Sequence, residues 1–422
     1  MLPKLNTTTS QTQTMESPST PYPMPPGLHA IPTEQLDLRP DSEIDHDILH
    51  PKPITSSKNI FFFWHTGYPS MHLYTQRTVR AWHRRFSKAG WSIYVIDRQP
   101  GSPRNIDRFL DVHDAKLFPQ AFADGTLTGT YAVQHTSDLV RLPLLLTYGG
   151  VYTDVGFMQI GDLDTLWNKT VGDSSSPYEL LSYHGGSADE YSLTNYFLCC
   201  ERGNPLFERA HRLLLKLWEG RTSTEGMHAS PLLKGVPLMG GSFSIDDEQG
   251  KHDAEESSRM LTDYIIQGQA ISMVMGLVDE DEGWNGPEYV RDHVYAIEFM
   301  VGAQLINDLT KWDGRKAFDL MSLKLPEAGE EESDEQAVAR DIVEQCLTRS
   351  YGFKLAHGMI LRVYQDTLGS LWRKNDGSDV VIGTYAHWLR YAMVYWCPDK
   401  LPGREQFTVS KPIKVGPLLK GA

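Results

Sequence analysis

The feature that most constrains the fold is a strand–helix–strand pattern that opens the ordered sequence. NIFFFWHTG, from residue 59, is a short apolar run typical of a buried strand. Spaced aromatic and apolar residues then predict a helix over about 70–88, and WSIYVID predicts a second strand ending at Asp97. This order of elements opens a parallel sheet, so we expect an α/β fold.

Polar side chains follow both of these strands. Ligands of such sheets bind beyond the carboxyl ends of the strands, which makes Trp64, His65 and Asp97 candidate site residues. Structural packing is the alternative explanation for each of them.

The composition limits the domain organisation. Residues 1–58 are rich in Ser, Thr and Pro and show no helical or strand period, so we expect a disordered leader. With 10 Trp, 19 Tyr and 15 Phe, the chain has enough apolar surface for a sizeable core. We expect residues 59–422 to form one domain, with an acidic loop insertion at about 326–336.

Several classes of protein are disfavoured. A net charge of -14 argues against nucleic acid as a partner. The four cysteines form no CxxC pair, so we expect neither a disulfide framework nor a structural metal. No signal-like N-terminus and no transmembrane segment is recognisable, so we expect a cytoplasmic protein.

Residues 131–150 predict a helix in which Ser137 is one possible N-cap and Gly149 the terminating residue. Pro143 predicts a kink or a later helix start. Asp138 and Arg141 are three residues apart and share a face, while the leucines supply a buried face.

VYTDVGFMQI, from residue 151, predicts a strand with Asp154 at its middle, followed by a turn at GDLD. A carboxylate in an apolar strand is costly unless it is paired, hydrogen-bonded or bound to a cation. Asp154 therefore points to a site.

Further helices are expected after the strand and turn of NYFLCCERGNP, and at 259–278 and 337–348. The aromatic stretch 385–396 is either core or the wall of an apolar pocket.

The segment SDLVRLPLLLTYGGVYTDVGFM, residues 137–158, resembles the donor-binding core of sugar transferases with a DXD motif. It is similar to the capsular-polysaccharide-synthesis type, related to yeast mannosyltransferases and clostridial toxin glucosyltransferases. The shared pattern, SDxxRxxxLxxxGGxYxDxD, is matched in order by Ser137, Asp138, Arg141, Leu145, Gly149, Gly150, Tyr152 and Asp154.

This resemblance implies a GT-A fold, with a Rossmann-like half, a mixed central sheet and additional helices. It implies transfer of a hexose from a UDP- or GDP-sugar to an acceptor hydroxyl, with retention of configuration. The implied donor-binding residues are Trp64, His65, Ser137, Asp138, Arg141 and Asp154. Asp154 would also be catalytic by approaching Mn²⁺ or Mg²⁺, which neutralises charge on the departing diphosphate.

The sequence departs from the pattern at Gly156, where the second aspartate of DXD would stand. His357, in KLAHG, is our candidate for the further metal ligand because a late histidine closes the metal site in many GT-A enzymes. Asp162 and Asp164 are weaker alternatives.

Two functions remain open. The first is hexosyl transfer to a polysaccharide, a lipid-linked precursor or a small metabolite. The second is a non-catalytic nucleotide-sugar-binding protein whose DXD motif has degenerated at Gly156.

Overall fold

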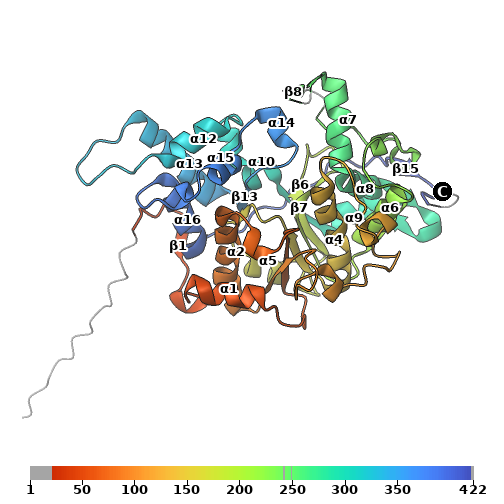
Figure 1. The fold of residues 1–422 in the computed structure, drawn as a ribbon, viewed down its shortest axis with the longest axis horizontal. Helices are drawn as coiled ribbons and strands as arrows, with labels where there is room; N and C mark the ends of the chain where they lie inside the picture. Colours follow the sequence, from red (N-terminus) through yellow and green to blue (C-terminus); the bar gives the residue numbers. More distant parts are fainter. Residues whose placement is uncertain (1–20, 241–242, 249, 420–422) are drawn as a thin grey trace, which may run out of the picture.

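The computed structural model describes residues 21–240, 243–248 and 250–419, and its centre is a six-stranded mixed sheet (Figure 1). Across the sheet the strands are β12 (Val294–Glu298), β6 (Leu180–His184), β7 (Leu193–Cys200), β4 (Gly150–Thr153), β2 (Asn59–Phe63) and β3 (Ser92–Ile96). β7 is antiparallel to β4 and β6, whereas the other neighbouring pairs are parallel. The predicted α/β fold with a mixed central sheet is confirmed.

Helices cover both faces of the sheet, because side chains alternate along each strand. Phe61 and Phe63 of β2 face a cluster with α4 (Ala132–Tyr148), α6 (Pro205–Trp218) and α8 (Ile266–Met275). Ile60 and Phe62 face the opposite cluster with α1 (Asp41–Leu49), α2 (Leu73–Phe86) and α5 (Leu163–Lys169). The first predicted strand, helix and second strand are therefore β2, α2 and β3.

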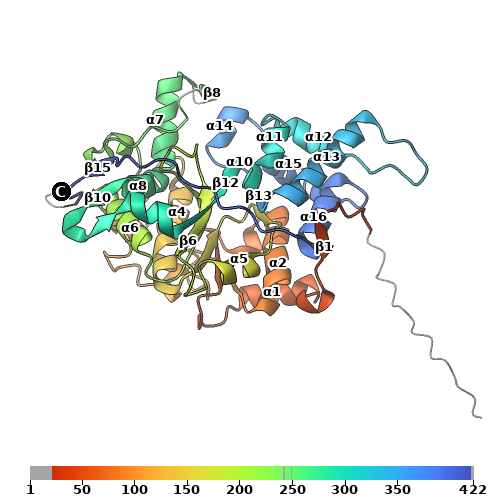
Figure 2. The ribbon, with the colours of Figure 1, turned by 180° about the vertical axis from the view of Figure 1, so that it is seen from behind.

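A helical lobe lies beside the sheet and packs on α2 (Figures 1 and 2). Its helices are α10 (Phe299–Ala303), α11 (Leu305–Leu309), α12 (Gly314–Ser322), α13 (Asp334–Arg349), α14 (Ile360–Tyr364), α15 (Leu368–Lys374) and α16 (Tyr385–Tyr395). β13 (Gly352–Lys354) runs from this lobe to the sheet layer, where it pairs antiparallel with β5 (Phe157–Gln159).

Shorter elements complete the fold. The helices are α3 (Gln120–Ala123), α7 (Ala254–Tyr264) and α9 (Gly286–His293). The strands are β1 (Leu28–Ala30), β8 (Ile245–Asp247), β9 (Gly250–His252), β10 (Leu277–Asp279), β11 (Trp284–Asn285), β14 (Trp396–Pro398) and β15 (Lys414–Val415). Among the described residues, none of the helices has the length and apolar character needed to cross a membrane.

The predicted leader is too long. Residues 1–20 lie outside the described residues, but β1 pairs antiparallel with β14 and α1 packs through Ile44 and Ile48 against the sheet cluster. The helix α1 was not predicted because residues 21–58 are mostly polar, and only Ile44 and Ile48, one helical turn apart, form its buried face.

Local details also differ in the motif region. α4 runs unbroken from Ala132 through Pro143, and its N-cap is Tyr131, so Ser137 is an interior residue. Gly149 ends the helix with a φ of 68°, as its sequence position predicted. The predicted helix at 259–278 is divided between α7 and α8. The aromatic stretch 385–396, expected to be either core or a pocket wall, is core: Tyr385–Tyr395 form α16 within the helical lobe.

The predicted strand around Asp154 is wrong. The backbone turns at 154–156, where the N–H of Phe157 donates to the Asp154 carbonyl at 2.9 Å, and divides the segment into β4 and β5. The GDLD segment then starts α5, whose N-cap is Asp162. The acidic loop lies between α12 and α13 and ends at the Ser333 capping box.

Candidate functional site

Asp154 lies directly after the carboxyl end of β4, beside the end of β2. β3 is on the other side of β2, so the chain order reverses between β2 and β4. In open α/β sheets, ligands bind in the crevice at such a switch point. The turn at Asp154 therefore stands where a ligand is expected.

Two cations bind the Asp154 carboxylate, one on each oxygen. The Nη2 of Arg141 lies 3.1 Å from Oδ1, and the Nζ of Lys354 donates to Oδ2 at 2.6 Å. Burial alone would raise the pKa of Asp154, but the charges of Lys354 and Arg141 together hold it below its usual value. The carboxylate is thus ionised and fully engaged.

Arg141 is the centre of a buried polar cluster. It projects from α4 and its side chain is 6% exposed. Its Nη1 lies 3.0 Å from Asp138 Oδ1 and donates to the Asn195 carbonyl at 2.8 Å. The guanidinium also lies over the Tyr152 ring, 5.0 Å from its centroid.

Ser137 joins the same cluster, because its hydroxyl lies 2.8 Å from the Tyr152 hydroxyl. The structure therefore brings together four of the predicted site residues, Ser137, Asp138, Arg141 and Asp154, in one cluster. Asp138 and Arg141 face this cluster rather than a free surface, since both are nearly buried.

His357 follows β13 and lies beside the turn, because a Cβ added at Gly156 would be 3.8 Å from its Cδ2. Its Nε2 is hydrogen-bonded to the Tyr74 hydroxyl of α2. Burial, followed by the charges of Lys354 and Arg373, lowers the pKa of His357 to about 3, so the ring is neutral at pH 7.

Trp64 and His65 stand at the end of β2, as predicted, but they point to different neighbours. The Trp64 ring meets His72 edge-on at 5.5 Å, and His72 stacks on Tyr74. A cavity of about 270 Å³ borders this group, lined by Met71, His72, Leu73, Tyr74, Trp372, Arg373 and Asp376. Trp64 is thus linked to the side of the site that holds His357.

Asp97 belongs to the loop that follows β3, and His65, at the end of β2, contacts this loop because its carbonyl accepts from the Arg98 N–H at 3.2 Å. Asp97 is fully buried and accepts hydrogen bonds from the N–H of Gln99 and the Ser102 hydroxyl. Burial lowers the pKa of His65, and the charge of Arg98 adds to this. Asp97 therefore organises its own loop.

The two weaker candidates, Asp162 and Asp164, have structural contacts. Asp162 caps α5 by accepting from the N–H of Thr165 at 3.0 Å. Asp164 pairs with Lys58 at 2.6 Å, at the opposite end of β2 from the Asp154 turn.

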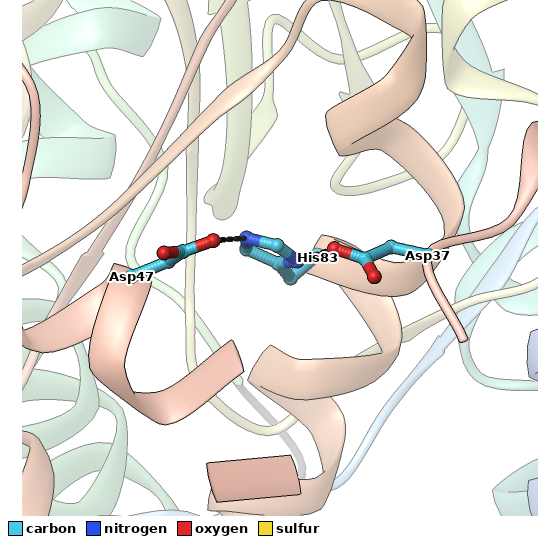
Figure 3. A group of neighbouring side chains, drawn as sticks. All are labelled: Asp37, Asp47 and His83. Carbon is cyan, nitrogen blue, oxygen red and sulfur yellow. Dashed lines mark ion pairs between the residues drawn. The ribbon is translucent and has the colours of Figure 1, made fainter. Parts of the chain in front are cut away.

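The donor set at Asp154 does not fit a metal ion as it stands. Both carboxylate oxygens hold protein cations, Gly156 offers no ligand, and His357 Nε2 is engaged by Tyr74. Within the described residues, the group close enough to hold an ion is another one, Asp37, Asp47 and His83 (Figure 3).

That group lies at the far end of α2. His83 is nine residues from Tyr74, which is about 14 Å along a helix. Figure 3 shows its ring between the two carboxylates. Arg39 Nη2 lies 2.6 Å from both Asp37 and Asp47, so a guanidinium already neutralises them. Its hydrogen bond lowers the pKa of Asp37 to about 2. A cavity of about 760 Å³ borders the group, away from Asp154.

Comparison with known proteins assigns this chain to a family. Residues 35–225 match the family described as "Capsular polysaccharide synthesis protein". The O-glycosyltransferase braB of Annulohypoxylon truncatum is 34% identical over 403 residues, 93% of this chain and 91% of that protein. The chain belongs to this family of glycosyltransferases.

Other relatives in the family are similarly complete. Glycosyltransferase afumC of Aspergillus fumigatus is 33% identical over 371 residues, 86% of this chain and 92% of that protein. The O-glycosyltransferase PaGT of Phomopsis amygdali is 28% identical over 384 residues, 90% of this chain and 92% of that protein. This glycosyltransferase therefore shares nearly its whole length with these proteins.

Sequence reasoning missed two residues of the site. Lys354 stands in the KLAHG segment that drew attention to His357, and Tyr74 lies in the predicted helix after β2. A lysine three residues before a candidate ligand was the available signal. Its contact with Asp154 depends on β13 reaching β5, which no local pattern predicts.

Proposed function

We propose that this glycosyltransferase moves a hexosyl group from a UDP- or GDP-sugar to an acceptor hydroxyl, with the donor bound at the Asp154 turn. The observation that carries the proposal is the cluster of Arg141 and Lys354 on Asp154 at the switch point of the sheet. Fixed cations at such a place suit an anionic diphosphate.

We assign the donor contacts by position. Trp64 and His65, at the end of β2, border the nucleotide, while Ser137 and Asp138 lie on its ribose and base side. Arg141 holds Asp138 and Asp154 in place and directs its charge at the phosphates. Residues 59–422 form the catalytic domain in this proposal, and β1 and α1 add to it.

The acceptor atom is an oxygen. Two relatives are named O-glycosyltransferases, which supports transfer to a hydroxyl. We assign the acceptor to the cavity lined by Tyr74 and Trp372, since the Tyr74 hydroxyl is hydrogen-bonded to His357. The aromatic stretch 385–396, which the sequence left open as core or as an apolar pocket wall, gives no support for an apolar acceptor, because α16 is core.

We keep retention of configuration as part of the proposal. In this chemistry the departing phosphate assists the incoming hydroxyl, and the protein supplies positioning and charge. Assistance by Mn²⁺ or Mg²⁺ is not part of the proposal, because protein cations already engage both oxygens of Asp154.

A binding protein without catalysis is the second candidate. It is favoured by one observation, the full occupation of the Asp154 carboxylate by protein cations. This function predicts that a nucleotide sugar stabilises the protein but is never consumed.

One screen distinguishes the glycosyltransferase from the binding protein. Thermal unfolding of the full chain is measured with UDP-glucose, GDP-mannose and other nucleotide sugars, with and without Mn²⁺, because a ligand of the folded state raises Tm. Release of UDP or GDP is then measured for each stabilising donor. We expect stabilisation and release; stabilisation without release, with acceptor hydroxyl compounds present, supports the binding protein.

A further inference from the structure

The Lys354 ammonium lies 2.6 Å from the carboxylate of Asp154, the residue that the motif assigns to a metal. We propose that the Lys354 ammonium neutralises the diphosphate as the sugar departs, so that transfer proceeds without a divalent cation. This inference rests on the proposed use of a nucleotide-sugar donor, and it assigns the cationic residue of that site.

The missing aspartate and the lysine have one structural cause, which is the approach of β13 to the turn. Leu355 N–H donates to the Gly156 carbonyl at 2.8 Å, just after Lys354 pairs with Phe157 in the β13–β5 ladder. A Cβ at position 156 would lie 3.0 Å from the Leu355 carbonyl oxygen. The strand that crowds the position of a second carboxylate therefore also delivers the ammonium.

The position of the ammonium matches the task. It lies 2.6 Å from Asp154 Oδ2, where a cation bound by this carboxylate would sit, and 5.8 Å from the Tyr196 ring centroid. An aromatic wall lowers local polarity and strengthens its interaction with an anion.

Lys354 is also the cation with freedom to reach a ligand. Its side chain is 12% exposed and that of Asp154 is 26% exposed, whereas Arg141 is 6% exposed and is held by Asp138 and the Asn195 carbonyl. A lysine stem is flexible and its ammonium has three donors. Lys354 can therefore hold Asp154 and a phosphate oxygen together.

The step balances without a metal. The bond between the sugar C1 and the phosphate oxygen breaks, and both electrons remain on the diphosphate. The acceptor oxygen forms the new bond to C1, and its proton passes to the departing phosphate. Lys354 keeps its proton throughout and donates a hydrogen bond to the developing charge.

The test measures UDP or GDP release by the full chain from UDP-glucose and GDP-mannose, in EDTA and in Mn²⁺. The variants are Lys354→Met, Lys354→Arg and the matched control Lys58→Met, which breaks the pair with Asp164 at the same 2.6 Å distance. Thermal unfolding checks that each variant is folded.

We expect wild-type turnover to continue in EDTA. Lys354→Met should lower kcat about a hundredfold, as loss of one donor to a developing anion does. Lys354→Arg should keep part of the rate, and Lys58→Met should match the wild type.

Two results overturn the inference alone: wild-type turnover that stops in EDTA and returns with Mn²⁺, or a folded Lys354→Met as active as Lys58→Met. The EDTA comparison uses the wild type, so it decides even if Lys354→Met fails to fold. If no nucleotide sugar is consumed in either condition, the proposed function fails and the inference with it.

Discussion

Two lysine–aspartate ion pairs lie at opposite ends of β2, with the same N–O distance but different surroundings. Lys58 and Asp164 lie 2.6 Å apart before the strand, and Lys354 and Asp154 lie 2.6 Å apart beyond its carboxyl end. Each aspartate side chain is 26% exposed. Asp164 also accepts from the Trp91 indole at 2.8 Å, whereas Asp154 also pairs with Arg141.

The surroundings of the two aspartates distinguish a structural ion pair from a functional site. Asp164 lies in the first turn of α5, where a carboxylate is stabilised by the helix dipole, and its other donors are neutral. Asp154 gathers two full positive charges at the switch point of the sheet. The charges of Asp164 and Lys58 balance each other, whereas Asp154 is paired with two cations that can also bind an anion.

The largest expected effect comes from removing the carboxylate of each pair. Asp154→Asn keeps the shape but releases both Arg141 and Lys354, so kcat for UDP or GDP release should fall about a thousandfold. Asp164→Asn should leave kcat unchanged, because Trp91 can still donate to the amide oxygen. A fully active Asp154→Asn enzyme would remove the distinction between the pairs.

Asp154 has a second cationic partner, Arg141, whereas among the described residues Asp164 has Lys58 alone. The motif alone suggests that Arg141→Ala weakens donor binding and leaves the fold intact, but the structure buries Arg141 between Asp138 and Asp154. Removing Arg141 leaves Asp138 without its cation and Asp154 with Lys354 alone, so the free energy of unfolding should fall by about 3–5 kcal/mol.

Urea unfolding of Arg141→Ala measures this loss. Lys58→Ala is the control, and it should cost within about 1 kcal/mol because its pair is partly exposed. A cost for Arg141→Ala no greater than that of the control would return Arg141 to a role in donor binding alone.

The sequence predicted the parts of the site that depend on local spacing. Ser137, Asp138 and Arg141 lie within one helix, and Gly149 fixes where the next strand begins. The helical period put Asp138 and Arg141 on one face, and the family resemblance grouped them with Ser137 and Asp154.

Two features escaped sequence reasoning because they depend on distant contacts. The turn at Asp154 was read as continuous strand, since VYTDVGFMQI has strand composition throughout and the break follows from β5 pairing with β13 rather than continuing β4. Lys354 reaches Asp154 across 200 residues of sequence. α1 was missed because its polar face dominates its composition.

Gly156 gives a smaller test, since it clears the path for the strand that carries Lys354. Gly156→Ala places a Cβ against the Leu355 carbonyl, so the backbone of β13 must shift. We expect a loss of about 1–2 kcal/mol in stability and a fall of about tenfold in kcat as Lys354 is displaced.

The control is Gly403→Ala, where an added Cβ meets nothing within 4 Å. It should change neither stability nor kcat. If Gly156→Asp proved more active than the wild type, close approach of β13 would not be the reason for the glycine.

The smallest effect is electrostatic and distinguishes the two lysines without a substrate. Burial comes first and the Lys354 charge second among the causes that lower the pKa of His357 to about 3. Because a nearby positive charge disfavours the imidazolium, Lys354→Met should raise this pKa, and Lys58→Met should leave it unchanged. His211, whose pKa burial lowers to about 4, should not respond to either change.

An NMR titration of the histidine rings measures these values, and unfolding experiments provide the sign. The folded state keeps His357 neutral while the unfolded chain takes up a proton below about pH 6.5, so stability falls as pH decreases from there towards 3. With a higher folded-state pKa, Lys354→Met should lose less stability across this window than Lys58→Met does. Equal losses in the two variants, with the pKa of His357 unchanged, would mean that the Lys354 charge does not act on His357. The Lys354–Asp154 and Lys58–Asp164 pairs would then be electrostatically alike as well as equal in length.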